Sequence, residues 1–576
     1  MKLFTILIAT LFTSPLNSQQ QSFSTVFENS NGKHTATYPQ VIDFYQKLAE
    51  LFPQISLQSI GTTDSGLPLH IATFNADGPQ SFDEIRKNKS ILLINNGIHP
   101  GESDGIDATM MLFRDLAQGI LQTPKHTVIV TIPIYNIGGS LNRNSTSRTN
   151  QNGPIEYGFR GNARNYDLNR DFIKNDSDNA KTFTNIFHLV KPDVFIDNHV
   201  SNGADYQYTL THLFTQHNKL GGQIGDYLHT FLMPALENNL KNKNWDITPY
   251  VNVFNQVPEK GFSQFMDYPR YSTGYTSLFN VLGMMVETHM LKPYKQRVQG
   301  TYQLMQSMIT IIDVEALTIK KIRHNYHKSI FAQASYALDW KIDEDKSTIL
   351  NFKGYHAQMI DSEVTLAKRL KYDRSKPFNK EVKYQNYFIP KVEITIPKAY
   401  IIPQGWHKVI TLLKRNNVSM TQLDKETKFK VESYKIADFE TRKAPYEGHY
   451  LHFNTHIKAA IIENIFHKGD YIIDLNQPAI RYIIETLEPQ APDSLFNWNF
   501  FDTILQQKEH FSPYVFEDIA AELLNNNPQL QKEFRKKQKT DEAFNKNWYA
   551  QLDWIHKHSK HYEKAHGQYP VYRVLK

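Results

Sequence analysis

A histidine and a glutamate lie three residues apart, directly after a strongly apolar stretch of the sequence. His99 and Glu102 follow the run ILLIN, and the Pro-Gly pair between them favours a tight turn. An imidazole nitrogen and a carboxylate oxygen at this spacing could bind one zinc ion. The pair alone is weak evidence, because 23 His and 58 Asp plus Glu give about two His-x-x-acid pairs by chance, and His467 and Asp470 form another. What distinguishes the first pair is its place at the end of a predicted buried strand.

Two further residues could complete a metal-dependent hydrolytic site. His199, in DVFIDNHVS, also follows an apolar strand, and two histidines with one glutamate are a known ligand set of catalytic zinc. The alternative for His199 is a strand-end histidine held by hydrogen bonds. Glu287, in MMVETHM, lies inside an apolar strand, where a carboxylate is costly unless it is paired or functional. We interpret Glu287 as a candidate general base, with a structural ion pair as the alternative.

The stretch FRGNARNYDLNRDF, residues 159–172, concentrates cations beside an amide. It holds Arg160, Arg164 and Arg170, and Asn169 directly precedes the last of them. A planar guanidinium next to an amide suits bidentate capture of a carboxylate. A surface loop would explain any one of these arginines, but it explains three of them within eleven residues less well.

The segments that would position these side chains alternate between strand-like and helix-like patterns. Strands are predicted at 55–61, 67–74, 90–96, 126–136, 193–200 and 281–290, and helices at 38–53, 105–121, 178–192 and 219–240. This alternation predicts an α/β domain from about residue 35 to about 325, with a mixed, mostly parallel sheet flanked by helices. Ligands of such sheets bind at the carboxyl ends of the strands, where the motifs above lie.

The pattern changes beyond residue 330. The segments 391–403 and 428–442 alternate with period two and carry polar breaks, which favours antiparallel strands. Later segments are rich in aromatic and helical patterns. We therefore expect residues 330–576 to form an accessory domain that is β-rich and then helical. The aromatic run FNWNFF, from residue 496, could be core or a surface that stacks on glycans.

Composition limits the classes of function. A chain of 576 residues is too long for one core, so two or more domains are expected. The net charge of +6 is small for this length and argues against dedicated nucleic-acid binding. The densest basic run, 532–539, is typical of a solvated helix face. The absence of cysteine excludes disulfides, thiolate zinc sites and cysteine nucleophiles, so a metal must be held by His, Asp or Glu.

The N-terminus has the pattern of a secretory signal peptide over residues 1–18. Lys2 precedes a mostly apolar stretch, and Ser18 precedes the polar run QQQS. The alternative is a buried first strand or helix. No later apolar run reaches the length of about 18 residues needed to span a bilayer, and no cysteine is available for a lipid anchor. We expect an exported protein, periplasmic or extracellular, without a transmembrane segment.

The motifs HPGE, NARNYDLNRDF, IDNHVS and VET occur in this order, each at a strand end or in the loop that follows. Together they resemble the M14 family of zinc carboxypeptidases, and the resemblance covers roughly residues 35–300. The stretch 159–172 is especially similar to the short-loop bacterial branch that includes murein peptide amidases. Residues 469–511 resemble the C-terminal region of large exported M14-like bacterial proteins. The resemblance implies a catalytic domain over residues 19–325.

The resemblance also implies roles at the reacting centre. One zinc ion per chain would be bound by His99, Glu102 and His199. Glu287 would be the general base and then the proton donor to the leaving amine. Arg160 would polarise the scissile carbonyl and stabilise the oxyanion, with Arg164 or Arg148 as alternatives for that role.

Further implied roles concern the substrate. Asn169 and Arg170 would bind its terminal carboxylate, and Arg164 would be a further substrate-binding residue. Tyr271 would cap this carboxylate, with Tyr275 as the alternative. The implied activity is that of a metallocarboxypeptidase, a zinc-dependent exopeptidase acting on peptides with a free C-terminal carboxylate.

Three other functions remain open at this point. The first is an amidase or carboxypeptidase acting on murein peptides, in which the terminal carboxylate belongs to diaminopimelate or a D-residue. The second is a deacylase of the aminoacylase-like branch of the same fold, which does not share the long C-terminal region in this arrangement. The third is a non-catalytic peptide-binding pseudoenzyme, for which retention of Glu287 has no explanation.

Overall fold

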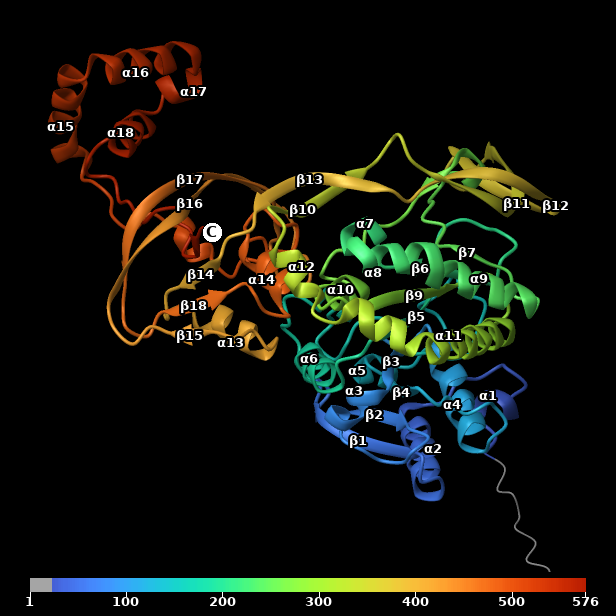
Figure 1. Cartoon of the computed structure of the whole chain (residues 1–576). Coiled ribbons are helices and arrows are strands. Elements are labelled where there is room, and N and C mark those ends of the chain that lie inside the picture. The colour runs from blue at the N-terminus through green and yellow to red at the C-terminus, as the bar shows by residue number, and fades with distance from the viewer. Residues whose placement is uncertain (1–22) are drawn as a thin grey trace, which may run out of the picture.

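A mixed eight-stranded sheet forms the centre of the N-terminal half of the molecule (Figure 1). The structure is a computed structural model that describes residues 23–576, so the predicted signal peptide lies outside the described residues. The strands are β1 (Ile55–Thr62), β2 (Pro68–Phe74), β3 (Ser90–Asn95), β4 (Thr127–Ile132), β5 (Val194–Val200), β6 (Leu210–Phe214), β7 (Ile247–Pro249) and β9 (Leu282–Thr288), in the order β1-β2-β4-β3-β5-β9-β6-β7. The central strands β4, β3, β5 and β9 are parallel, and β1, β2 and β6 are antiparallel to their inner neighbours. The predicted sheet class is confirmed.

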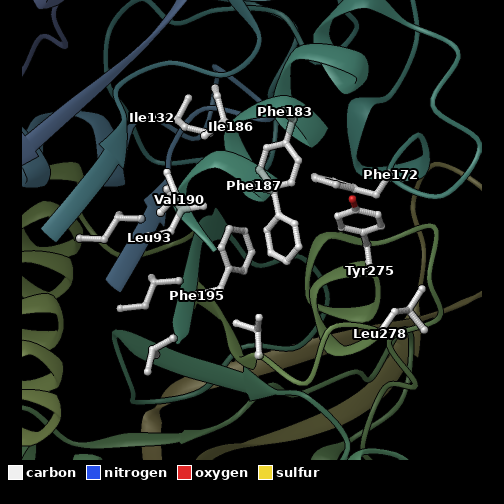
Figure 2. Packing of buried hydrophobic residues seen from close by; sticks show 14 of the residues in the cluster. Leu93, Ile132, Phe172, Phe183, Ile186, Phe187, Val190, Phe195, Tyr275 and Leu278 are labelled. Carbon is white, nitrogen blue, oxygen red and sulfur yellow. The ribbon is translucent and has the colours of Figure 1, made fainter. Parts of the chain in front are cut away.

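Helices cover both faces of this sheet, which explains why its central strands are buried and mostly apolar. Every residue of β3, β4 and β5 is buried. α4 (Asp104–Ala117) and α11 (Tyr294–Arg323) pack together against β3 and β5, and α2 (Tyr38–Leu51) contacts α4. On the other face, the aromatic side chains of α6 (Asp178–Val190) pack on Phe195 of β5 (Figure 2). The sheet is therefore a rigid base for the loops at its strand ends.

The region after residue 330 contains long antiparallel strands. β10 (Ser335–Ile342) pairs with β13 (Phe388–Thr395), and β11 (Thr348–Asp361) with β12 (Lys368–Gln385). A six-stranded sheet has the order β15-β18-β14-β19-β16-β17, and its members are β14 (Ala399–Ile402), β15 (Thr421–Gln422), β16 (Thr427–Thr441), β17 (His452–Phe466), β18 (Tyr471–Asp474) and β19 (Tyr572–Val574). β19 comes from the end of the chain, so the predicted order of strands followed by helices needs one correction: the last element returns to the sheet.

Helices α15 (Pro513–Asn526), α16 (Pro528–Thr540), α17 (Glu542–Asn545) and α18 (Trp548–Lys557) form a small bundle with its own apolar core. Figure 1 shows this bundle standing away from the six-stranded sheet. The basic run 532–539 lies on α16, where most of its side chains are exposed and Phe534 is buried in the bundle, as the charge pattern predicts. No helix within residues 23–576 is both long and apolar enough to cross a bilayer.

The N-terminal and C-terminal regions share packing over two areas. One continuous apolar cluster includes residues of the eight-stranded sheet and of the six-stranded sheet. In the other area, the short strand β8 (Phe262–Ser263) pairs with Tyr384 and Gln385 at the end of β12. Phe496, Trp498 and Phe501 of the run FNWNFF are fully buried, so these side chains belong to the core and not to a glycan-stacking surface.

Candidate active site

The predicted metal ligands come from the carboxyl ends of neighbouring parallel strands. His99 and Glu102 lie in the loop between β3 and α4, and His199 is the penultimate residue of β5. Because β3 and β5 pair in parallel, these ends open at the same edge of the sheet. Gly97 starts the loop with a φ of 65°, in the left-handed region that favours glycine. The sheet topology thus brings together residues that are far apart in the sequence.

The ligand atoms of these three side chains converge. Oε1 of Glu102 lies 3.2 Å from Nδ1 of His99, and Oε2 of Glu102 lies 3.0 Å from Nδ1 of His199. One possible ligand atom from each residue lies within 4.8 Å of the other two, and all three side chains are buried. This spacing is that of a site for a single ion.

The donor set fits zinc. Nε2 of His99 lies 2.9 Å from Oδ1 of Asp167, and Nε2 of His199 lies 2.9 Å from Oδ2 of Asp197. A proton on each Nε2, donated to the carboxylate, leaves Nδ1 as the metal ligand, which is the usual support of a metal-binding histidine. Nδ1 of His99 is buried and has no hydrogen-bond partner among the described residues. Two such nitrogens and a carboxylate are a donor set of catalytic zinc.

Charges around Glu102 keep it ionised. Burial alone would raise the pKa of Glu102, but the charges of His99 and Arg148 and the hydrogen bond with His199 hold it well below its usual range. Nη1 of Arg148 donates a hydrogen bond to Oε1 of Glu102 at 2.9 Å. Burial also opposes the charge on His199, but Asp197 and Glu102 raise the pKa of that imidazole well above its usual value. The carboxylates around His199 thus favour a positive charge at this position, which a bound cation would supply in place of the proton.

Glu287 lies beside His199 on the adjacent strand. The two residues are register partners in the pairing of β5 with β9, and the side chain of Glu287 is half-buried and lines the pocket. Burial raises the pKa of Glu287 to about 8, the charge of His199 opposes this rise, and the charge of Glu102 adds to it. A carboxyl group with such a raised pKa can accept and return a proton near neutral pH.

The three arginines considered for the oxyanion lie in different surroundings. Arg160 lines the pocket, with Nη1 3.8 Å from Oε1 of Glu102. Arg148 contacts Glu102 but is not part of the pocket lining. Arg164 is more than half exposed and pairs with Asp64 at 3.5 Å, outside the lining. The structure therefore brings Arg160 to the pocket and does not bring Arg164 there.

The predicted carboxylate-binding residues belong to the same pocket. Asn169 and Arg170 lie in the 3-10 turn η1 (Leu168–Arg170) and both line the pocket. Tyr271 lines it too, with the guanidinium carbon of Arg170 4.6 Å from the centre of its ring. Burial raises the pKa of Tyr271, although the charge of Arg170 opposes this, so its phenol keeps its proton at neutral pH.

Tyr275, the alternative to Tyr271, is part of the core. It lies in α10 (Ser272–Ser277) among Phe172, Phe183 and Phe187 (Figure 2). Its hydroxyl donates to Oδ1 of Asn416 at 2.7 Å. A fully buried side chain with these partners does not reach the pocket, so Tyr275 has a packing role.

The pocket has a volume of about 340 Å³. Beyond the residues named above, its lining is neutral and largely apolar: Val200, Asn202, Leu213, Tyr250, Asn252, Phe254, Phe265 and Met285. Glu102 and Glu287 are the carboxylates of the lining, and both lie at the metal end. A larger cleft of about 600 Å³, between α6, α11 and the C-terminal region, contains none of the predicted site residues.

Two carboxylates of the site were not assigned from the sequence. Asp197 accepts from His199 and from Oγ of Ser272 at 2.5 Å, and Asp167 accepts from His99 and from Nη2 of Arg160 at 2.8 Å. A signal for Asp197 was present, since it precedes His199 by two residues and alternate residues of a strand share one face. Asp167 had no such signal, because a loop has no fixed periodicity.

Residues 41–191 match the model of the family Peptidase_M14, described as zinc carboxypeptidase. This segment includes four of the predicted site residues, His99, Glu102, Asn169 and Arg170. The predicted resemblance to M14 zinc carboxypeptidases is thereby confirmed over this segment, and with it the general class of enzyme, a metallocarboxypeptidase. The candidate ligand His199 and the candidate base Glu287 lie beyond the matched segment, so their assignment depends on the geometry described above.

Solved structures of metallocarboxypeptidases are similar to parts of this chain. The metallo-carboxypeptidase of Burkholderia cenocepacia is 16% identical over 49% of this chain and 70% of its own, with a TM-score of 0.37. The carboxypeptidase A of Helicoverpa armigera is 12% identical over 49% and 74%, with a TM-score of 0.38. The metallo-carboxypeptidase of Pseudomonas aeruginosa, in complex with (2-guanidinoethylmercapto)succinic acid, is 13% identical over 49% and 69%, with a TM-score of 0.36. No curated protein matches the sequence.

Proposed function

We propose that this protein is a zinc-dependent exopeptidase that hydrolyses the C-terminal peptide bond of peptides. The observation that carries the proposal is a single pocket whose lining joins the His99–Glu102–His199 donor set, a carboxylate of raised pKa and an amide–guanidinium pair. Zinc held by the three donors would polarise the scissile carbonyl and acidify the attacking water.

The protein's own groups then have distinct tasks. Glu287 takes the proton of the attacking water and returns it to the leaving amine, a double role to which its raised pKa is suited. Arg160 donates to the oxygen on which negative charge develops, an interaction worth about 3 kcal/mol for one such donor. An ion pair of 2.8 Å with Asp167 holds the Arg160 guanidinium and so limits the conformational freedom of that side chain before substrate binds.

Recognition of a chain end comes from Asn169 and Arg170. Asn169 and Arg170 offer an amide and a guanidinium to the terminal carboxylate of the substrate, which is a group that an internal peptide bond lacks. The Tyr271 hydroxyl, protonated at neutral pH, is a further donor beside Arg170. These contacts make the enzyme an exopeptidase.

The remaining lining favours an uncharged C-terminal side chain. Leu213, Phe265 and Met285 offer apolar surface. The carboxylates of the lining, Glu102 and Glu287, already serve as candidate metal ligand and candidate general base. A lysine or arginine side chain would lose water there without gaining a counter-charge. We therefore propose a preference for apolar or aromatic C-terminal residues. Export to the periplasm or the extracellular space, with residues 19–325 as the catalytic domain and 330–576 as the accessory domain, is part of the same proposal.

The test is mass spectrometry of a peptide panel incubated with the zinc-loaded mature protein. The panel pairs free with amidated C-termini, varies the last residue from Phe and Leu to Lys, and includes a murein tripeptide. The expected result is loss of single residues from free carboxylates only, faster for Phe and Leu, and abolished by a chelator. Cleavage of the murein peptide alone would replace the proposal by action on cell-wall peptides. Zinc binding without any cleavage would favour the pseudoenzyme.

A further inference from the structure

A tight turn in the C-terminal region touches the loop that holds the candidate substrate-binding residues. The turn joins β16 to β17 and is closed by two backbone hydrogen bonds, from Tyr446 N–H to the His449 carbonyl at 2.7 Å and from His449 N–H to the Tyr446 carbonyl at 3.1 Å. At its tip, Oε2 of Glu447 accepts a hydrogen bond from the backbone N–H of Asp167 at 2.8 Å. Residues 280 positions apart thus meet at the active-site loop.

The conformation of Glu447 is unusual for its residue type. Its φ is 50° and that of Gly448 is 81°, so both central residues of the turn are left-handed. Turns of this kind favour Asn, Asp or Gly at these positions. A glutamate there is costly unless its side chain makes a contact that the shorter residues cannot make. The hydrogen bond to Asp167 is such a contact.

The turn also contacts the segment around Asp167 at two further points. Nε2 of His449 lies 2.7 Å from Oδ2 of Asp176, beyond the far end of the DLNR segment. Gly448 lies so close to Tyr166 that an added Cβ would stand 2.9 Å from the Tyr166 hydroxyl oxygen. Contacts on both sides of Asp167 fix the position of the turn against the loop, so the Glu447 hydrogen bond is not an isolated surface contact.

Asp167 connects this turn to the reacting centre. Its carboxylate accepts from Nε2 of His99 at 2.9 Å and lies 2.8 Å from Nη2 of Arg160. The same carboxylate lies 3.9 Å from Nη1 of Arg170 and accepts from the backbone N–H of Asn169 at 3.0 Å. A displacement of the Asp167 backbone would therefore move a metal ligand, the oxyanion donor and the carboxylate-binding pair together.

We propose that Glu447 is a positioning residue of the active site, and that the C-terminal region is thereby part of the catalytic unit. The proposal rests on the function proposed above. Glu447 holds the backbone of Asp167, and Asp167 in turn orients His99 for the metal and Arg160 for the oxyanion. Supporting groups outside the ligand shell typically contribute about 10- to 100-fold in metal affinity or activity. For a residue one step further away, the expected contribution lies at the lower end, about tenfold.

The test compares Glu447→Asn with Glu447→Gln in the full-length protein. Asn suits the left-handed backbone but is too short to reach Asp167, whereas Gln keeps an acceptor oxygen of the same reach. Glu463→Gln is the matched control, because it removes the same charge from an exposed position on β17. Three quantities are measured: zinc affinity by competition with a chelator, kcat/KM on a peptide with a free C-terminus, and the melting temperature.

We expect Glu447→Asn to weaken zinc affinity and lower kcat/KM by about tenfold each, while Glu447→Gln and Glu463→Gln stay within about twofold. Unchanged zinc affinity and kcat/KM in Glu447→Asn would overturn the proposal, and so would a lowered melting temperature with no change in either. If the unaltered protein binds zinc but cleaves no peptide, the proposed function fails by itself. The zinc affinities of the two Glu447 variants then still decide the positioning role.

Discussion

Asp197 fixes the ring of His199: Nε2 of the imidazole lies 2.9 Å from Oδ2 of the carboxylate, and Nδ1 is directed to Glu102. Asp197 is itself held by Oγ of Ser272 and by the amide of Asn95 at 3.3 Å. Its carboxylate therefore has one orientation and selects the Nε2-protonated form of the histidine. This arrangement prepares Nδ1 for a metal before the metal arrives.

We expect Asp197→Asn to weaken zinc affinity by about 10- to 100-fold, because an amide can donate to Nε2 and favour the wrong tautomer. Competition with a chromophoric chelator measures the change. Asp246→Asn is the control, since Asp246 forms only a surface pair with Lys353. Zinc affinity that is equal in the two variants would contradict the role given to Asp197.

Replacement of Glu287 separates metal binding from proton transfer. Glu287→Gln preserves the shape of the side chain but cannot accept a proton, so kcat is expected to fall by about 100- to 10,000-fold. KM and zinc affinity are expected to stay within about threefold, because the three metal ligands and the carboxylate-binding pair are intact. Steady-state kinetics and the chelator assay measure these quantities.

Glu237→Gln is the matched control for this change. Glu237 pairs at 2.8 Å with His212, which lies on β6, next to the strand that holds Glu287. Glu237 itself does not line the pocket. Turnover by Glu287→Gln at the rate of this control would exclude Glu287 as the general base.

The local part of the site could be predicted from sequence because it depends on strand ends. His99, Glu102 and His199 follow apolar strands, and parallel neighbours must open at one edge, so their meeting follows from the topology. Arg160 could not be separated from Arg164 in this way. Both lie in one irregular loop, and only the structure shows that Arg164 contacts Asp64 and the ring of Tyr166 and lies outside the pocket lining.

Long-range pairings and weak patterns account for what the sequence did not reveal. The helix expected at 219–240 is divided at Gly221 and Gly222, both with positive φ, and by a π-helical turn at Leu228–Leu232. The short strands β6 and β7 were not predicted, although Leu213 of β6 lines the pocket. The contact of Glu447 with Asp167 depends on how two separate sheets pack, which no local periodicity encodes.

Recognition of the terminal carboxylate can be tested with Arg170 and Arg164. Arg170→Ala is expected to raise KM for a free-acid peptide by about tenfold or more, since a charge-assisted bidentate contact is worth about 1.5–3 kcal/mol. The same variant should discriminate less between free-acid and amidated peptides. Arg164→Ala is expected to change KM by less than about twofold, because its guanidinium is exposed and faces Asp64. Equal effects of both variants would return Arg164 to the substrate site.

The buried Glu485 of α14 (Ile480–Leu487) gives the protein a pH-dependent stability. It accepts a hydrogen bond from the Tyr336 hydroxyl at 2.9 Å, and burial raises its pKa to about 7 although Tyr336, Lys219 and Arg481 favour the charged form. Between about pH 4.5 and about pH 7 the folded state keeps the carboxyl proton of Glu485, whereas the unfolded chain has lost it. The contribution of Glu485 to the free energy of unfolding is therefore complete below about pH 4.5 and is lost as the pH rises to about 7.

The raised pKa of Glu485 corresponds to a decrease of up to about 3 kcal/mol in the free energy of unfolding as the pH rises from about 4.5 to about 7. Glu485→Gln removes the titration, so the urea midpoint of the variant should fall less than that of the unaltered protein between about pH 5 and about pH 8. Glu463→Gln, at an exposed position, should follow the unaltered protein. A Glu485→Gln variant with the same pH dependence as the unaltered protein would show that Glu485 is ionised in the folded state throughout this range.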